Sequence, residues 1–386
     1  MTEPVHDAGS AAAETILLTG ATGTVGRELL ARMLRAPGAR ILCLVRARDN
    51  DEAGRRLDGV LATRPGGTVN DEQRRRVRAI AGDLTRERLG LPDRDWHQLA
   101  GDVTRIVHGA ASVTWNLPLG ESRAVNVTGT ERMLQLAREG RRRGVLTKFD
   151  YLGTCMVAGK RTGVIGEDDV DGSHGFYNSY EQAKYEAELL VRSHAADIPT
   201  SIFRLAMVVG DSRTGYTSTF NVMYWPLKMM SRGRVLAAPG SRSGVLDMVP
   251  LDFVGEAIET LSADPAQRGK CFHIAAGPAA STVGDVLDLA ARRFGVRPPR
   301  LLGPRAFGLL RPLLYAVVWG KRRETMKKGR VYVPYLSYQT RFDTAHVRAA
   351  LEPLGIRPPT VHEYFEQLID YALASDWGRR PAGGPA

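Results

Sequence analysis

Two sets of residues in this sequence have types and spacings suited to chemistry. In residues 15–26 an apolar run stops at Gly20, and two more glycines follow at three-residue spacing, Gly23 and Gly26. Glycines let a ligand approach the backbone closely, and the N–H groups that open the following helix attract an anion. The segment therefore predicts a pyrophosphate site for a dinucleotide. The alternative is a purely structural tight turn.

The second set is Tyr180 and Lys184, which are four residues apart in a predicted helix. This spacing places both side chains on one helix face. A phenol has a pKa of about 10 and is a poor acid–base catalyst at neutral pH. A neighbouring ammonium group lowers that pKa, so the pair predicts a proton-transfer site. The alternative is an amphipathic helix with one half-buried tyrosine.

The elements that must position these residues follow one pattern. Short apolar runs alternate with helical segments, which is typical of an α/β fold with a Rossmann-type, doubly wound parallel sheet. We expect residues 14–210 to form the dinucleotide-binding domain, with 245–280 returning to it. Residues 211–244 and 281–380 then form a smaller, mostly helical C-terminal lobe that binds the substrate. The predicted strands are 15–18, 40–45, 77–81, 104–108, 148–152, 200–205 and 270–274.

Two residues at predicted strand ends bear on the cofactor. An acid about 20 residues beyond the glycines would hold the ribose 2′-hydroxyl of NAD, whereas an arginine there suits a 2′-phosphate. Arg46 occupies that place and favours NADPH, unless it is only a solvated arginine at a strand end. Asp83 follows the third strand. It either accepts a hydrogen bond from the adenine amino group or caps the next turn.

Composition narrows the class of protein. The chain has 386 residues, 43% hydrophobic and 25% charged, and a net charge of +11 without a basic-aromatic module. We therefore expect no nucleic-acid binding; an acidic partner and an arginine-rich composition are the remaining explanations. Cys43, Cys155 and Cys271 lack pairing or metal-ligand spacing, so we expect no metal and a reducing compartment. Without an apolar signal segment or a run of about 18 apolar residues, a cytoplasmic location is expected.

Taken in order, several motifs resemble the extended short-chain dehydrogenase/reductase superfamily. Within it the chain is similar to the thioester-reductase branch, which has a male-sterility-type NAD(P)-binding domain. That branch includes terminal reductase domains of nonribosomal peptide synthetases, carboxylic acid reductases and fatty acyl-CoA reductases. The branch usually has Arg-Pro-Gly where this chain has Arg-Leu-Ala at 204–206, and Ser-Thr where it has Gly-Thr at 153–154. The motifs are Thr19-Gly20-xx-Gly23-xx-Gly26, residues 43–47, Asp83-Leu84, 108–113, Asn126, Thr154, Tyr180-xxx-Lys184 and 210–215.

The resemblance implies an NADPH-dependent reductase that converts an acyl thioester, bound to CoA or to a carrier protein, to an aldehyde. Further reduction of the aldehyde to an alcohol is left open. Tyr180 would donate the proton, Lys184 would lower its pKa and hold the nicotinamide ribose, and Thr154 would hydrogen-bond the developing oxyanion. The cofactor would be held by Thr19, Gly20, Thr22, Gly23, Thr24, Val25, Gly26, Arg46, Asp83, Leu84, Ala110, Ala111, Ser112, Asn126, Tyr180 and Lys184.

Two other functions remain open. One is a different extended-family dehydrogenase or epimerase acting on a sugar nucleotide, a sterol or another alcohol or ketone. The other is a non-catalytic NADP(H)-binding regulator.

Two segments bear on the substrate. Residues 220–230 are apolar and aromatic, and line either an acyl pocket or the lobe core. Residues 306–328 are apolar with a basic end. They suit contact with a membrane surface, docking of an acidic acyl or peptidyl carrier protein, or a buried lobe helix. The expected protein is a free-standing reductase that meets its carrier in trans.

Overall fold

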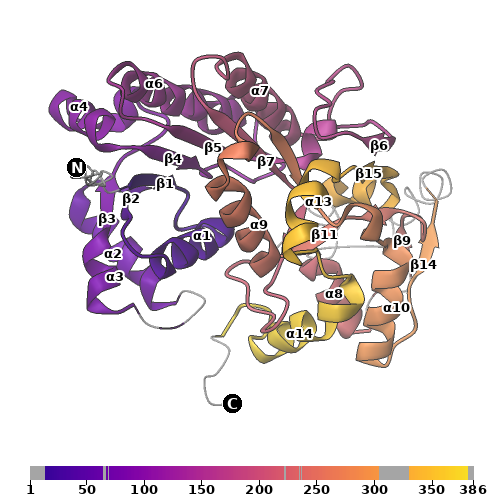
Figure 1. Cartoon of the computed structure of the whole chain (residues 1–386). Coiled ribbons are helices and arrows are strands. Elements are labelled where there is room, and N and C mark those ends of the chain that lie inside the picture. The colour runs from indigo at the N-terminus through magenta and orange to yellow at the C-terminus, as the bar shows by residue number, and fades with distance from the viewer. Residues whose placement is uncertain are drawn as a thin grey trace, which may run out of the picture.

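A seven-stranded, entirely parallel sheet forms the centre of the molecule (Figure 1). The computed structural model describes residues 14–63, 67, 69–220, 223–233, 235, 237–303 and 330–380. The strand order is β12-β7-β5-β4-β1-β2-β3, which confirms the Rossmann-type sheet predicted from the alternating pattern. The strands are β1 (Thr15–Thr19), β2 (Arg40–Val45), β3 (Val77–Ala81), β4 (Arg105–His108), β5 (Lys148–Thr154), β7 (Thr200–Leu205) and β12 (Cys271–Ile274).

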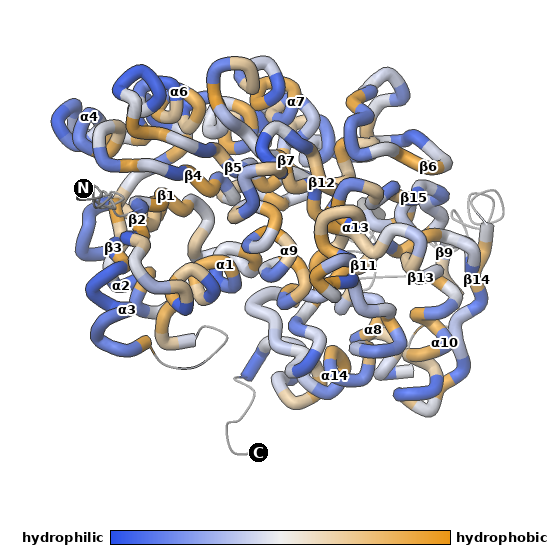
Figure 2. Tube along the Cα trace, viewed as in Figure 1, coloured by the Kyte–Doolittle hydropathy of each residue, from blue (hydrophilic) through white to orange (hydrophobic). Residues whose placement is uncertain are grey.

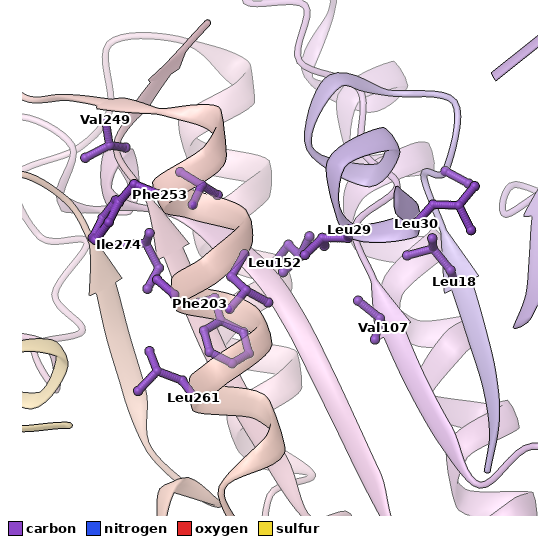
Figure 3. Packing of buried hydrophobic residues seen from close by; sticks show 14 of the residues in the cluster. Leu18, Leu29, Leu30, Val107, Leu152, Phe203, Val249, Phe253, Leu261 and Ile274 are labelled. Atoms are coloured by element: carbon purple, nitrogen blue, oxygen red, sulfur yellow. The ribbon is translucent and has the colours of Figure 1, made fainter. Parts of the chain in front are cut away.

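Helices cover both faces of the sheet, which is why its strands are nearly continuous apolar runs. Figure 2 shows hydrophobic residues along β1 and hydrophilic residues on the outer helices. In Figure 3, Phe253 and Leu261 of α9 lie beside Phe203 and Ile274 of the sheet. One face carries α1 (Thr24–Arg35), α2 (Asn50–Ala62), α9 (Leu251–Ala263) and α13 (Ala345–Leu351); the other carries α4 (Asp93–Asp102), α6 (Gly129–Arg142) and α7 (Ser179–Ser193).

The C-terminal lobe has its own apolar core, formed by α8 (Tyr224–Ser231), α10 (Val283–Phe294) and α14 (Val361–Ala374). In the described part of the chain, four small strand pairs lie within the lobe or at its border. None of them was predicted, because strands of two or three residues carry no readable periodicity. The parallel pairs are β6 (Gly163–Ile165) with β15 (Thr340–Phe342), β8 (Met207–Val209) with β11 (Met248–Pro250), and β9 (Ala237–Pro239) with β14 (Arg300–Leu302); β10 (Val245–Leu246) and β13 (Ser281–Thr282) are antiparallel.

Segment 245–280 divides between these regions. Strand β12 joins the main sheet beside β7, and α9 packs on the face of that sheet. Strands β10 and β11 instead pair with β13 and β8, outside the main sheet. The predicted apolar and basic segment 306–328 lies outside the described residues. Within the described ranges, none of the helices combines the length and the apolarity needed to cross a bilayer.

Candidate active site

The glycine turn connects β1 to α1 at the edge where the strand order reverses between β1 and β4, the usual ligand crevice of this fold. Gly20 has φ +81°, and an added Cβ would lie 2.8 Å from the Gly109 carbonyl oxygen. A Cβ on Gly26 would lie 2.0 Å from the Gly20 carbonyl oxygen, so helix and turn pack backbone to backbone. Gly23 is the N-cap of α1 and has no side chain to accept from the first-turn N–H groups. The turn therefore fits a pyrophosphate.

Behind the turn, a buried hydrogen-bond chain joins β1 to β4. The Thr19 hydroxyl accepts from the Gly109 and Ala110 N–H groups and lies 2.8 Å from His108 Nδ1. The two N–H donors leave the Thr19 proton for Nδ1, so the imidazole carries its own proton on Nε2, 3.1 Å from the Thr130 hydroxyl. Burial lowers the pKa of His108 to about 3 and keeps it neutral. Thr19 therefore supports the turn from inside, and its hydroxyl is engaged by neighbours within the fold.

Asn126 also acts through the backbone. Its Oδ1 accepts from the Ser112 N–H at 2.8 Å, and its Nδ2 donates to the Ser112 carbonyl at 3.1 Å. The side chain is buried and holds the loop after β4 in place. Asn126 lies in a π-helical turn (Ala124–Thr128) between α5 (Leu119–Arg123) and α6. Such turns are frequent at functional sites.

The remaining turn and loop residues of the expected cofactor set lie at the same edge of the sheet. Arg46 is exposed at the end of β2, and in the described part of the chain its guanidinium makes no hydrogen bond or ion pair. For Asp83, hydrogen bonds from Thr85 and the charge of Arg46 outweigh burial and lower its pKa. Several other residues of the expected cofactor set are at least partly exposed at this edge. They are Thr22, Gly23, Thr24, Val25, Leu84, Ala110, Ala111 and Ser112.

Thr154 and Tyr180 meet where β5 ends and α7 begins. The Thr154 hydroxyl accepts from the Met156 N–H at 3.2 Å and lies 3.3 Å from the Leu205 carbonyl oxygen. Burial raises the pKa of Tyr180 to about 12 and outweighs a hydrogen bond with Thr154. We expected a lowered Tyr180 pKa, and this is not found here. The phenol is held in its protonated form, which is the form that can donate.

Lys184 shares the helix face with Tyr180, but its ammonium group points to the sheet. Its Nζ donates to the Leu152 carbonyl at 2.9 Å and lies 4.2 Å from the centroid of the Tyr151 ring. Burial lowers the pKa of Lys184 to about 7, against the opposing charge of Glu188. The chain therefore brings Thr154, Tyr180 and Lys184 to the end of β5, with a protonated phenol and a lysine that titrates near neutral pH.

A segment of the lobe contacts the start of α1, which the sequence did not predict. The Thr24 hydroxyl lies 2.8 Å from the Ser218 hydroxyl and 3.4 Å from that of Thr219, more than 190 residues away. Tyr216 donates to the Thr63 carbonyl at 3.0 Å beyond the end of α2. No motif spacing connects positions this far apart. The loop after residue 211 therefore lies beside the predicted pyrophosphate site.

The predicted acyl-pocket segment 220–230 contributes mainly to the lobe core. Tyr224, Leu227 and Met230 are buried against α10 and α14, whereas Trp225 is 41% exposed. A small cavity lies elsewhere, between the lobe and the segment after Thr154. It is lined by Met156, Met207, Val245, Leu246, Asp247, Tyr335, Tyr338, Thr340 and Phe342. The lobe-core alternative thus describes most of segment 220–230.

Arg204, the residue of segment 204–206 that matches the pattern of the branch, places a charged side chain under the site. Arg204 is 1% exposed and donates to both carboxylate oxygens of Glu188, at 2.7 Å in the shorter contact. It also lies 3.0 Å from His273 Nε2. Glu188 is one turn beyond Lys184 on α7. The ion pair therefore fixes α7 to β7 directly beneath the catalytic candidates.

A comparison with known families decides the identity. Residues 18–258 match the model described as male sterility protein. The chain belongs to the male sterility protein family. Its relatives include a linear gramicidin synthase from Brevibacillus parabrevis, 31% identical over 68% of this chain and 5% of the relative. A carboxylic acid reductase from Mycobacterium tuberculosis is 32% identical over 70% of the chain and 25% of the relative. This male sterility family chain thus spans a quarter or less of these curated relatives, and falls in the expected thioester-reductase branch.

Solved structures agree with this assignment. The terminal R domain of the myxalamid PKS-NRPS pathway superposes with a TM-score of 0.81 at 28% identity, covering 95% of this chain and 92% of that one. A UDP-glucuronic acid 4-epimerase from Bacillus cereus in complex with NAD reaches 0.66 at 17% identity, over 95% and 99%. The second likeness shows the fold alone. Family members are NAD(P)-dependent reductases of the thioester or carboxylic acid type.

Proposed function

We propose that this chain is an NADPH-dependent reductase of acyl thioesters carried by a carrier protein or by CoA, yielding an aldehyde. The observation that carries the proposal is the meeting of Thr154, Tyr180 and Lys184 at the carboxyl end of β5. Two hydroxyl groups there face one another and can receive a carbonyl oxygen that gains negative charge. The similarity to reductase domains of peptide synthetases and to carboxylic acid reductases supports a thioester as the substrate.

Arg46 supports NADPH over NADH. Its guanidinium is exposed at the end of β2, and the Arg56 guanidinium donates to the Arg46 carbonyl nearby. Two arginines at this place favour a 2′-phosphate. The glycine turn would hold the pyrophosphate, and Asp83 the adenine edge. When bound there, the cofactor supplies the hydride.

The residues of the chain would handle the oxygen and its proton. Thr154 and Tyr180 donate to the carbonyl oxygen as negative charge develops, and one such donor contributes roughly 3 kcal/mol to lowering the barrier. Tyr180 then gives up its proton and leaves a hemithioacetal, which collapses to thiol and aldehyde. The raised pKa of Tyr180 keeps the proton available until the oxyanion, a much stronger base, draws it away. Lys184 would hold the nicotinamide ribose.

The alternative is an extended-family dehydrogenase or epimerase acting on a sugar nucleotide or another alcohol or ketone. The sheet and the Tyr-Lys pair suit it equally well, and the epimerase likeness supports the fold. Arg46 argues against it, because NAD users commonly have an acid there. A carrier protein acting in trans remains part of the thioester proposal.

The test is an NADPH-consumption assay on a panel of acyl-CoA and acyl-carrier thioesters, beside a UDP-sugar and a ketone panel. We expect turnover with a thioester and release of free thiol and aldehyde. Tyr180→Phe should abolish turnover while NADPH still binds. Folded protein that reduces no thioester, or that acts on the sugar or ketone panel alone, would contradict the proposal.

A further inference from the structure

A tyrosine from the C-terminal segment is hydrogen-bonded to the helix turn that carries Tyr180. Tyr335 lies in the 3₁₀-helix η6 (Arg330–Ser337), 154 residues after Glu181, and is 4% exposed. Its hydroxyl donates to Glu181 Oε1 and accepts from Asn178 Nδ2 at 2.8 Å. Glu181 is the residue next to Tyr180, and Asn178 is the N-cap of α7. The phenol thus contacts the first turn of α7 on both sides of Tyr180.

The contacts of Tyr335 close into a ring. Asn178 Oδ1 accepts from the Glu181 N–H at 3.0 Å, and Glu181 Oε2 accepts from the Tyr177 N–H at 2.8 Å. The Tyr335 ring packs on Trp115 and Tyr177, with centroids 4.6 and 5.6 Å away. The Tyr335 hydroxyl and the Glu181 carboxylate, at the centre of the ring of contacts, both have hydrogen-bond partners. Moving Tyr335 would therefore disturb the cap of α7 and the backbone just before Tyr180.

The same segment also holds the chain that follows Thr154. Tyr338 donates from its hydroxyl to the Gly159 carbonyl at 3.0 Å, just after the 3₁₀ turn Cys155–Ala158. Thr340 donates to the Arg161 carbonyl. Residues 335–340 therefore bind both segments that carry the proposed oxyanion donors, Thr154 and Tyr180. Two donors act together only when their separation is fixed within a fraction of an ångström.

We propose that Tyr335 is a positioning residue, which through Glu181 and Asn178 holds the Tyr180 hydroxyl in register with Thr154. The inference rests on the proposed role of Tyr180 as proton donor. It assigns to the C-terminal segment a part in turnover that is separate from the choice of substrate. It also makes Glu181 the link through which pH acts on the site.

The charge state of Glu181 decides the direction of the hydrogen bonds in the ring. As a carboxylate it accepts at both oxygens, from Tyr335 and from the Tyr177 N–H. Of these two neighbours only the Tyr335 hydroxyl can accept from the protonated form, and it must then turn its own proton away from Glu181. Burial raises its pKa to about 7, against hydrogen bonds from these two neighbours and the charge of Lys160. In the described part of the chain, the phenols of Tyr177, Tyr180 and Tyr338 are the other titratable groups that face it. The hydrogen-bond directions seen in the ring therefore belong to the carboxylate form of Glu181, which predominates above about pH 7.

The experiment compares Tyr335→Phe and Glu181→Gln with a matched control, Tyr364→Phe. Tyr364 is similarly buried in α14 and donates to the Met248 carbonyl at 3.2 Å, so its substitution also deletes one buried hydroxyl, but in the lobe core. For each purified full-length variant, kcat, the KM for NADPH, Tm and the pH dependence of kcat are measured on the best thioester. We expect kcat of Tyr335→Phe to fall about tenfold or more with the KM for NADPH unchanged. Tyr364→Phe should lower Tm comparably and leave kcat unchanged.

The pH profile separates positioning from stability. In the unsubstituted protein kcat should fall as pH drops through about 7. Tyr335→Phe should shift this acid limb to higher pH, because a hydrogen bond that lowers the Glu181 pKa is lost, and Glu181→Gln should remove it. Equal kcat in Tyr335→Phe and Tyr364→Phe, or an acid limb unchanged in Glu181→Gln, would overturn the inference. Should Tyr335→Phe fail to fold, the Glu181→Gln profile decides alone. A wild-type chain without thioester turnover, or an active Tyr180→Phe, overturns the proposed function instead.

Discussion

The ammonium group of Lys184 lies over the ring of Tyr151, 4.2 Å from its centroid, although both side chains are buried. The ring face and the Leu152 carbonyl replace water around the charge. Burial still outweighs them, and the nearest carboxylate, Glu188, is engaged by Arg204. A buried ammonium with a pKa near 7 is expensive for the fold, which indicates retention for function.

Lys184→Met should therefore stabilise the protein while removing activity. Because the folded pKa of about 7 lies below the unfolded value of 10.5, the unfolded chain binds more protons between these pH values, and wild-type stability rises with pH in that window. The increase in the free energy of unfolding of Lys184→Met over the unsubstituted protein should be largest at pH 7 and below, on the order of 1–3 kcal/mol. It should shrink toward pH 10. Urea unfolding at pH 6 and pH 9 measures it.

The control is Lys160→Met. Lys160 is exposed, and its Nζ lies 5.9 Å from the centroid of the Tyr177 ring, so it keeps a similar ring contact without the burial. This substitution should change stability little at either pH. A Lys184→Met protein with no gain, or with the same gain at both pH values, would contradict the burial argument.

Arg46→Ser should reduce the preference for NADPH over NADH. Loss of a charge-assisted contact to a 2′-phosphate costs roughly 1.5–3 kcal/mol, which is about ten- to a hundredfold in affinity. Arg48→Ser is the matched control, because Arg48 is tied to Glu52 by a 2.8 Å ion pair and lies two residues on. Fluorescence titrations that give the Kd values for NADPH and for NADH test this. An unchanged ratio in Arg46→Ser would remove Arg46 from the cofactor site.

Gly26→Ala should abolish dinucleotide binding. The new Cβ would lie 2.0 Å from the Gly20 carbonyl oxygen, so α1 must move away from the turn. Gly54→Ala in α2 is the control: its Cβ meets nothing within 4 Å, and alanine favours the helix by up to about 1 kcal/mol. Calorimetric titration with NADPH and thermal unfolding report both effects. Tight binding by folded Gly26→Ala protein would exclude this packing.

Glu188→Ala should destabilise the fold strongly, by roughly 3–5 kcal/mol, because it leaves the buried Arg204 charge without its carboxylate. Glu186→Ala, two residues earlier on α7, breaks a partly exposed 2.6 Å pair with Arg123 and should cost less than about 1 kcal/mol. Urea unfolding of both variants and of the unsubstituted protein gives the two losses of stability. Similar losses of stability in the two variants would show that breaking the buried pair costs no more than breaking an exposed one.

Much of the sheet follows from local pattern. All seven strands were predicted within a few residues, because runs buried on both faces are apolar throughout. The glycine turn was predicted because a backbone-to-backbone contact, such as that between Gly26 and Gly20, tolerates no side chain. The π-helical turn that holds Asn126 has no compositional mark, so the sequence did not predict it. Thr19 belongs to the expected set, yet its hydroxyl supports the turn from inside.

The sequence by itself determined the Rossmann-type sheet, the glycine turn after its first strand, and the placement of Tyr180 and Lys184 on one helix face. These depend on residues close in the chain, where periodicity and spacing are physical constraints. Only the tertiary structure brought Tyr335 to Glu181 and Ser218 to Thr24, because side chains so far apart in sequence meet through the packing of whole elements. It also decided the pKa values of Tyr180 and Lys184. Desolvation depends on what surrounds a group in space, and no local pattern encodes it.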